Sequence, residues 1–203
     1  MARRPTLVIF LRAPQIGAVK RRLAQEVGAG PTYHFYVQTS RDLIRRLGRS
    51  YRWRLVLAIT PDRFAASARF WPASIPRIAQ GPGDLGTRMG RVLARLDAGP
   101  VVIVGSDIPG ITTRHIERAF DVLARHEAVF GPAKDGGYWL IGLARRRIDP
   151  EALTHRLFAG VRWSTSHALA DTRANLPRGA EGPALETLED VDNAASWRRA
   201  GGS

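Results

Sequence analysis

The sequence predicts an α/β fold in which a mostly parallel central sheet is flanked by helices. Short apolar runs rich in β-branched residues recur along the 203-residue chain, and amphipathic helical patterns lie between them. Such runs are typical of strands buried on both faces, and strands that alternate with helices are typical of parallel sheets. A hydrophobic content of 44% is enough for a sizeable core, and we expect one domain over residues 1–203.

The predicted elements follow from these patterns in chain order. The apolar runs predict strands at residues 6–11, 55–59, 101–104, 128–130 and 138–143. The amphipathic patterns predict helices at residues 33–49, 86–97 and 113–126. Thr112 or Thr113 is a suitable N-cap for the third helix. Pro and Gly are frequent at 177–183, which predicts a loop before a last segment at 184–199.

The composition excludes several classes of protein. The chain has no cysteine, which excludes disulfides, thiolate metal sites and cysteine nucleophiles. No apolar run approaches the ~18 residues of a membrane span. Arginines before the run at 7–11 imitate a signal peptide, but Arg12 ends that run and no small-residue cleavage site follows. We therefore expect a cytoplasmic protein.

Positive charge dominates the chain, with a formal net charge of +13. Residues 1–54 hold 12 basic and two acidic side chains, which favours an anionic partner such as a nucleotide, a phosphate, a nucleic acid or an acidic surface. A solvated basic surface would have the same composition. All but two of the 31 basic residues are arginine, and Lys20 and Lys134 are the exceptions. A lysine in a chain so rich in arginine marks a position that suits a compact ammonium better than a planar guanidinium.

Polar motifs follow the predicted strands, where α/β sheets bind their ligands. After the first strand, RAPQIGAVKRRLA places Gly17 and Lys20 in a loop that leads into a helix. Backbone N–H groups at a helix start, together with Arg12 and Lys20, suit a phosphate. The stretch matches neither GxxxxGK[ST] nor GxGxxG, and an arginine-rich helix start is the structural alternative.

Two further stretches suit a nucleotide and a metal. After the strand VVIV, the sequence GSDIPG places Asp107 where a carboxylate can hold Mg²⁺ or Mn²⁺; an Asx turn is the structural alternative. Residues 80–90, QGPGDLGTRMG, contain glycines that would let a base or ribose approach the backbone, although an ordinary loop would also contain them.

Taken together, six motifs resemble the GT-A-fold nucleotide-diphospho-sugar transferase superfamily. More narrowly, the chain resembles the small bacterial family DUF2064, whose members are similar to the guanylyltransferase that activates phospholactate. The motifs span positions 12–193 and read RAPQIGAVKRRLA, QGPGDLGTRM, GSDIPGI, GPAKDGGYWLIGL, VRWSTSHAL and TLEDVDN. The resemblance implies one GT-A-like domain, a nucleotide or nucleotide-sugar donor, a small-molecule acceptor, and Mg²⁺ or Mn²⁺ as cofactor.

The resemblance also implies roles for particular residues. Lys20, Asp107 and Asp135 would be catalytic, and Asp107 with Asp192 would bind the metal. The donor nucleotide would be bound by Arg12, Gly17, Lys20, Gln80, Gly81, Gly83, Asp84 and Asp107. The acceptor would be bound by Lys134, Asp135, Gly136, Gly137, Trp163, Ser164 and Thr165.

The stretch KDGGY has two interpretations on sequence grounds, because a plain hairpin turn also explains it. In the functional interpretation, Asp135 orients an acceptor hydroxyl or accepts its proton, and Lys134 holds an acceptor phosphate or carboxylate. Gly136 would let the acceptor approach the backbone. Tyr138 and Trp139 fit strand packing, with one of them facing the cleft by alternation.

The last motif departs from the family pattern. The family has DVDTxxDL where this chain has DVDNAASW, so Asn193 and Ser196 stand in place of Thr and Asp. Asp192 is retained, but the role of the last segment is open, and a non-catalytic GT-A domain is one interpretation.

The function that the resemblance implies is transfer from a nucleotide donor. Our first expectation is a metal-dependent glycosyltransferase that uses a nucleoside-diphosphate sugar. The alternative is a guanylyltransferase-like nucleotidyltransferase that passes a nucleoside monophosphate from a triphosphate to a phosphorylated acceptor. A remote alternative is a nucleic-acid-binding protein, because RSYRWRL at 49–55 interleaves arginines with aromatics.

Overall fold

The fold is a six-stranded sheet between two layers of helices. The computed structural model describes residues 4–67, 69–146 and 155–201. The strand order is β3-β2-β1-β4-β6-β5, and β6 runs antiparallel to both of its neighbours while the other pairs are parallel. The strands are β1 (Thr6–Arg12), β2 (Arg54–Thr60), β3 (Arg77–Ala79), β4 (Val101–Gly105), β5 (Ala128–Pro132) and β6 (Tyr138–Leu143). This architecture confirms the predicted fold class.

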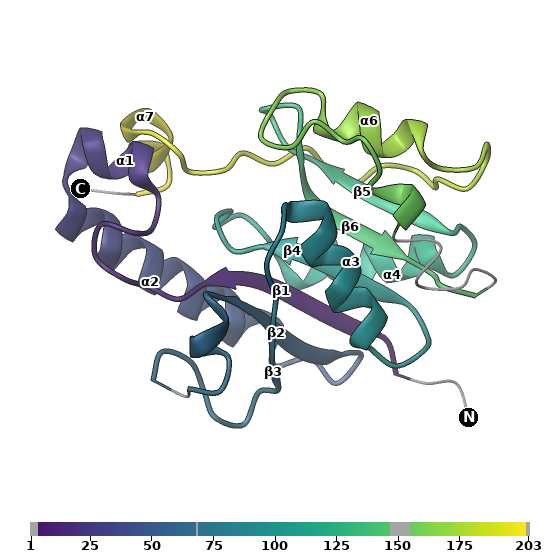
Figure 1. Cartoon of the computed structure of the whole chain (residues 1–203), viewed down its shortest axis with the longest axis horizontal. Coiled ribbons are helices and arrows are strands. Elements are labelled where there is room, and N and C mark those ends of the chain that lie inside the picture. The colour runs from purple at the N-terminus through teal and green to yellow at the C-terminus, as the bar shows by residue number, and fades with distance from the viewer. Residues whose placement is uncertain (1–3, 68, 147–154, 202–203) are drawn as a thin grey trace.

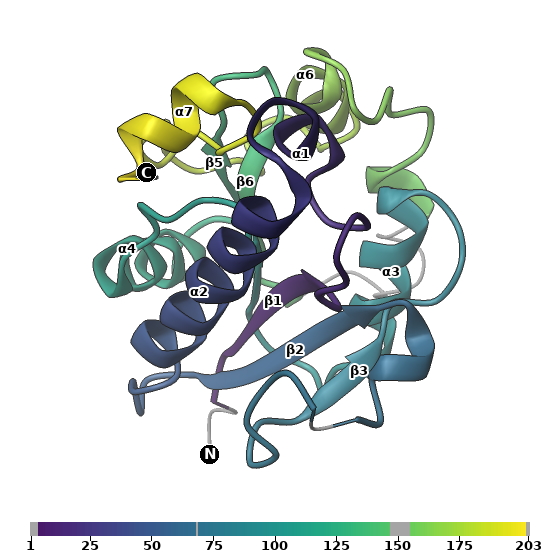
Figure 2. The ribbon, with the colours of Figure 1, turned by 90° about the vertical axis from the view of Figure 1, so that its left-hand side faces the viewer.

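Helices cover both faces of the sheet, with α2 and α4 on one side and α3 on the other (Figures 1 and 2). No helix in the described part of the chain is long and apolar enough to cross a membrane. The helices are α1 (Arg21–Val27), α2 (Ala29–Leu47), α3 (Leu85–Arg95), α4 (Thr113–Leu123), α6 (Ala168–Ala174) and α7 (Ala194–Arg199), with a short 3₁₀ turn at Asp62–Phe64.

Alternation along the strands divides the core into two clusters. On β1, Leu7 and Ile9 point to the cluster that contains buried residues of α2 and α4. Val8 points to the opposite cluster, which contains buried residues of α3. All three side chains are 0% exposed. Burial on both faces explains why the strands read as continuous apolar runs in the sequence.

The predicted strands are all present, while helix boundaries and short elements differ from expectation. Helix α2 begins at Ala29 rather than at residue 33. Pro31 lies in its first turn, where a missing N–H costs no hydrogen bond, so the Gly-Pro stretch does not delay the helix. Thr112 is the N-cap of α4 and forms a capping box. Strand β3 and helix α6 were not predicted, because three and seven residues give too short a pattern.

The C-terminal segment runs beside β5 before it forms α7. Backbone hydrogen bonds join Leu185 to Phe130 and Leu188 to Pro132, at 2.9 and 3.1 Å between nitrogen and oxygen. The chain then crosses to the end of β4, where the Val191 N–H donates to the Asp107 carbonyl at 3.3 Å. This path brings residues 190–192 next to loops that are far away in the sequence.

Candidate active site

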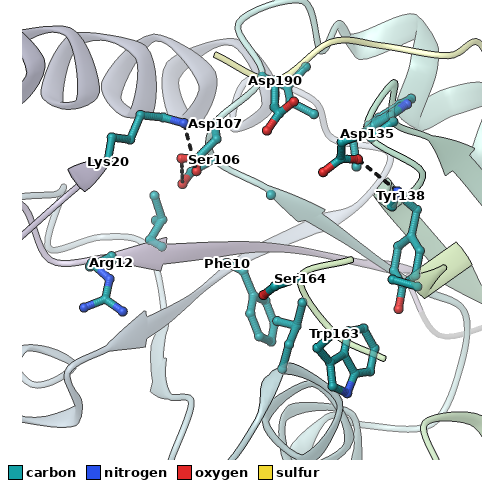
Figure 3. Close-up of a pocket in the computed structure, with 18 of the residues that line it drawn as sticks. Phe10, Arg12, Lys20, Ser106, Asp107, Asp135, Tyr138, Trp163, Ser164 and Asp190 are labelled. Atoms are coloured by element: carbon teal, nitrogen blue, oxygen red, sulfur yellow. Dashed lines mark hydrogen bonds and ion pairs between the residues drawn. The ribbon is translucent and has the colours of Figure 1, made fainter. Parts of the chain in front are cut away.

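A cavity of about 460 Å³ lies beyond the carboxyl ends of β1 and β4 (Figure 3). Its wall combines the loop before α1, the loop after β4, the β5–β6 hairpin, the loop before α6 and the C-terminal segment. The cavity therefore forms where a parallel sheet presents its loops. Its chemically relevant lining residues are Arg12, Lys20, Arg88, Asp107, Asp135, Tyr138, Trp163, Ser164, Thr165 and Asp190.

Lys20 connects two segments that are far apart in the sequence. Its Nζ lies 3.2 Å from Asp107 Oδ2 and 2.9 Å from Asp192 Oδ1. The Lys20 side chain is only 4% exposed. Burial alone would lower the pKa of Lys20, but the charges of Asp107 and Asp192 outweigh burial and raise its pKa above the usual 10.5. The ammonium is therefore firmly charged, and it holds the two carboxylates within the ~8 Å expected for groups that share a divalent ion through direct or water-bridged contacts.

The two aspartates are positioned by different means. Asp107 follows β4 directly, and Ser106 Oγ donates to its Oδ1 at 3.2 Å. Asp192 precedes α7, whose N-cap Asn193 accepts a hydrogen bond from the Ser196 N–H at 2.8 Å. Ser196 Oγ in turn accepts from the Asp192 N–H at 3.1 Å. Asn193 and Ser196, the two departures from the family pattern, thus form a complete capping box that fixes Asp192.

Tyr36, which sequence reasoning missed, fixes the end of β1 from helix α2. Its buried hydroxyl accepts a hydrogen bond from the Arg12 N–H at 2.9 Å and donates to the Arg12 carbonyl at 2.8 Å. Burial is the main reason that the pKa of Tyr36 is raised. The hydroxyl therefore stays protonated and positions Arg12. One buried tyrosine in an amphipathic helix gives no sequence signal for this contact.

A cationic hollow of about 600 Å³ adjoins the cavity at Lys20 and Arg12. Arg21 and Arg22 also line it, and Gly17 forms part of its backbone wall. Gly17 has a φ of +75°, and a Cβ there would have no atom within 4 Å, so the space beside it is open. We call this space, lined by Arg12, Gly17, Ala18, Lys20, Arg21, Arg22 and Asp192, the cationic hollow. Its arginine and lysine side chains suit a polyphosphate, because they can donate charge-assisted hydrogen bonds to phosphate oxygens.

The side chain of Gln80, which the resemblance implies as a nucleotide ligand, makes its hydrogen bonds within the protein, and its role at a nucleotide stays a prediction. Its amide nitrogen donates to the Leu11 and Ala58 carbonyls at 3.1 and 2.7 Å, and its Oε1 accepts from Arg88 Nε at 2.9 Å. The amide of this buried residue is therefore fully used. Gln80 positions Arg88, a cavity residue that sequence reasoning missed and whose pKa is lowered mainly by burial.

Unlike Gln80, the predicted nucleotide ligands Gly81, Gly83 and Asp84 lie outside the lining of this cavity, and each makes a local structural contact. The Asp84 carboxylate accepts a hydrogen bond from the Thr87 N–H at 2.8 Å, which caps α3 and lowers the pKa of Asp84. Gly83 packs on Thr87, where a Cβ would come within 2.9 Å of a methyl carbon. Gly81 packs on the side chain of Arg91. Nucleotide contacts by these three residues remain a prediction from resemblance alone.

The β5–β6 hairpin gives local contacts to two of the residues predicted to bind the acceptor. Lys134 is exposed and its Nζ lies 3.2 Å from Glu189 Oε2, outside the cavity lining. Gly136 is covered by the loop before α6, because a Cβ there would lie 2.7 Å from Ser166 Cα. Its φ of +86° and this close packing require glycine, so Gly136 seats this loop, and contact with an acceptor stays a prediction. Gly137 and Asp135 do line the cavity, and the Gly137 N–H donates to Asp135 Oδ1 at 2.9 Å.

The loop before α6 forms the aromatic side of the cavity with Tyr138. The Trp163 and Tyr138 rings lie 6.4 Å apart in an edge-to-face arrangement, and Ser164 and Thr165 continue the wall. Arg162 fixes this loop by donating from Nε and Nη2 to Asp171 at 2.9 and 2.8 Å. These bonds lower the pKa of Asp171. Of the two strand aromatics, Tyr138 packs with the α3-side cluster and Trp139 with the other.

Asp190 is a further cavity residue that sequence reasoning missed. Burial, followed by the charges of Asp192 and Asp135, raises its pKa to about 6. Figure 3 shows its carboxylate facing that of Asp135 across one end of the cavity. The sequence EDVD contained a signal, because alternate residues of an extended segment share a face, but only Asp192 was selected.

The donor set fits a weakly held divalent ion. Asp107 and Asp192 supply carboxylate oxygens, which Mg²⁺ and Mn²⁺ prefer. Within the described residues, no group of three or more His, Asp or Glu side chains is arranged to hold a metal. An ion at this place would therefore take its remaining ligands from water or phosphate.

Comparisons with solved structures define the class of the fold. A candidate nucleotide-diphospho-sugar transferase from Desulfovibrio desulfuricans G20 is 27% identical, with a TM-score of 0.82 over 95% of this chain and 84% of that one. CMP:2-keto-3-deoxy-manno-octonic acid synthetase, solved with CTP, is 12% identical, with a TM-score of 0.62 over 98% and 97%. Rv0371c of Mycobacterium tuberculosis H37Rv, solved with manganese, is 18% identical, with a TM-score of 0.59 over 98% of each chain. The protein has the nucleotide-diphospho-sugar transferase and cytidylyltransferase fold.

A family model identifies the chain more narrowly. The model described as an uncharacterized protein conserved in bacteria, DUF2064, matches residues 43–165, and the chain belongs to this family. No curated protein matches the sequence. The family predicted from the six motifs is thereby confirmed.

Proposed function

We propose that the protein transfers a nucleoside monophosphate from a nucleoside triphosphate to a hydroxyl group of a small acceptor, with Mg²⁺ or Mn²⁺. One observation carries this proposal. Asp107, Asp192 and Lys20 converge on one point at the border between the cavity and the cationic hollow. A donor whose reactive phosphate lies at that border would have its base in the cavity and its remaining phosphates in the hollow.

The donor side of the site matches a triphosphate. Arg12, Arg21 and Arg22 line the cationic hollow together with Lys20, and these side chains could contact several phosphate groups of one donor. Asp107 and Asp192 would hold the ion. Bound there, it would neutralise negative charge that develops on the leaving phosphates. The solved relative with CTP and the relative with manganese support this type of donor and cofactor.

The acceptor side favours a hydroxyl compound over a phosphorylated one. Asp135 and Asp190 face each other there, and Lys134, the expected ligand of an acceptor phosphate, is paired with Glu189 outside the cavity. An anionic acceptor group would be repelled by the two carboxylates. A hydroxyl would instead donate a hydrogen bond to Asp135, and Tyr138 and Trp163 would pack on its carbon skeleton.

The proposed reaction balances with these groups. The acceptor oxygen attacks the α-phosphorus while Asp135 takes its proton. The bond from the α-phosphorus to the bridging oxygen breaks, and pyrophosphate leaves with its charge neutralised by Lys20 and Arg12. The products are a nucleotidylated acceptor and pyrophosphate.

The test is to identify the leaving group. The protein is incubated with Mn²⁺, each of the four nucleoside triphosphates and a mixture of small hydroxyl metabolites, and released pyrophosphate is measured. We expect pyrophosphate that depends on both acceptor and metal and that is lost in Asp107→Asn. Asp121→Asn, which removes an exposed carboxylate of α4, is the control and should remain active. Acceptor-independent or Asp107-independent release would contradict the proposal.

Glycosyl transfer is the second candidate, and it is favoured by the 27% identity to a candidate nucleotide-diphospho-sugar transferase. The same assay with nucleoside-diphosphate sugars distinguishes it, because this reaction releases a nucleoside diphosphate. If nucleoside-diphosphate sugars release a nucleoside diphosphate while nucleoside triphosphates release no pyrophosphate, glycosyl transfer replaces our first proposal.

A further inference from the structure

The ammonium of Lys20 lies where a shared divalent ion would lie. It is within 3.2 Å of one carboxylate oxygen of Asp107 and within 2.9 Å of one of Asp192. An ion shared by these oxygens would lie about 2.1 Å from each. An ion that bound these same two oxygens would compete with the ammonium for the space between the two carboxylates.

Lys20 is well suited to hold this place. Its side chain is 4% exposed, whereas those of Asp107 and Asp192 are 44% and 47% exposed. Among the ion pairs of the described residues, Lys20 is the only partner of either carboxylate. The lysine backbone has a left-handed φ of 42°, which turns the chain into α1 directly at this residue. The two ion pairs are thus a built feature of the loop, and an incoming metal must break both of them, of which the one to Asp192 is also a hydrogen bond.

We propose that Lys20 is an internal counter-ion that the metal must displace, so that the ion enters with the nucleotide phosphates and not before them. This inference rests on the proposed function, because the polyphosphate is what receives the displaced ammonium. Lys20 also lines the cationic hollow, so a phosphate bound there meets its ammonium without a change of the surrounding fold. The metal–polyphosphate complex, rather than free metal, is then the species that the site binds.

The displacement predicts that Mn²⁺ binds more tightly when Lys20 loses its charge. Replacing Lys20 by methionine keeps an unbranched apolar stem but removes the competing charge. Two ion pairs no longer oppose the metal, and the two carboxylates lose the one ion-pair partner that they have among the described residues. Mn²⁺ alone should therefore bind about 10- to 100-fold more tightly to Lys20→Met than to the wild type. A lysine that binds only phosphate and does not compete for the two carboxylates would leave the affinity for Mn²⁺ alone nearly unchanged.

The experiment is a titration of the full chain with Mn²⁺ alone, with free Mn²⁺ measured by electron paramagnetic resonance. Lys134→Met is the matched control, since it removes the other lysine, which is paired with Glu189 on the surface, and it should bind Mn²⁺ as the wild type does. Lys20→Arg keeps the charge and should bind Mn²⁺ weakly. Unchanged or weaker Mn²⁺ binding by Lys20→Met would overturn the proposal.

A second measurement uses the wild type, and it applies even if Lys20→Met folds poorly. Because the chain has two lysines, ¹⁵N-lysine labelling gives two ammonium signals in NMR spectra. Mg²⁺ alone should leave the Lys20 signal in place, and Mg²⁺ with a nucleoside triphosphate should shift it. A Lys20 signal that stays unchanged in the complex would overturn the displacement. The Mn²⁺ titration contains no nucleotide, so failure of the proposed nucleotidyl transfer would appear in the pyrophosphate assay and not here.

Discussion

Gly136→Ala tests whether the hairpin turn seats the loop of the acceptor side. The added Cβ would lie 2.7 Å from Ser166 Cα and 2.8 Å from the Ser166 carbonyl carbon, and backbone atoms cannot rotate away as a flexible side chain can. Gly136 also has a φ of +86°, which costs a residue with a Cβ about 1–2 kcal/mol. Overpacking adds about 1–3 kcal/mol. The free energy of unfolding should therefore fall by about 2–5 kcal/mol.

Gly160→Ala is the control that separates the two costs. Gly160 has a φ of +66°, but nothing lies within 4 Å of an added Cβ, so only the conformational cost of about 1–2 kcal/mol applies. Urea unfolding measures both variants, and each kcal/mol corresponds to a Tm change of roughly 2–4 °C at this chain length. If the two variants lost the same stability, the packing of the loop on the hairpin would be refuted.

Further predictions concern the support of the site. Tyr36→Phe removes the hydroxyl that bonds both backbone groups of Arg12, and it should cost about 1–3 kcal/mol in urea unfolding. Tyr51→Phe, at a residue that is 86% exposed, should cost less than about 0.5 kcal/mol, and equal losses would contradict the assignment. The pKa of Asp190 is raised from 3.8 to about 6 in the folded protein. The protonated carboxyl therefore stabilises the folded state below about pH 4, and this stabilisation is lost as the pH rises through 6. After allowance for partial exposure, Asp190→Asn should be about 1–2 kcal/mol more stable than the wild type at pH 8 and equal near pH 4. A difference in unfolding free energy that did not vary with pH would contradict this.

The sheet could be predicted from the sequence because burial on both faces leaves continuous apolar runs. The position of Asp107 could then be predicted from the strand before it, since the end of a central strand is where the sheet presents side chains to a ligand. The position of Asp192 did not follow from spacing. It depends on backbone hydrogen bonds that hold the C-terminal segment beside β5, and only the resemblance indicated it.

Tertiary contacts explain what residue type and motif could not indicate. Gln80, Lys134 and Gly136 were assigned from residue type and motif, but the polar or conformational needs of each are met within the protein. Tyr36 and Asp190 were missed because a buried hydroxyl contact and a carboxylate pair arise only when distant segments meet. Sequence patterns indicate which elements form, whereas partners across the cavity depend on the tertiary fold.

The most direct test of the account is the position of a bound metal. Crystals of the protein with Mn²⁺ and a non-hydrolysable nucleoside triphosphate analogue can be measured at the manganese absorption edge, where anomalous scattering locates the ion. The account predicts one ion between Asp107 and Asp192 that also contacts the phosphates, with the Lys20 ammonium moved onto a phosphate oxygen. An ion elsewhere, or Lys20 still between the two carboxylates while the analogue is bound, would contradict it.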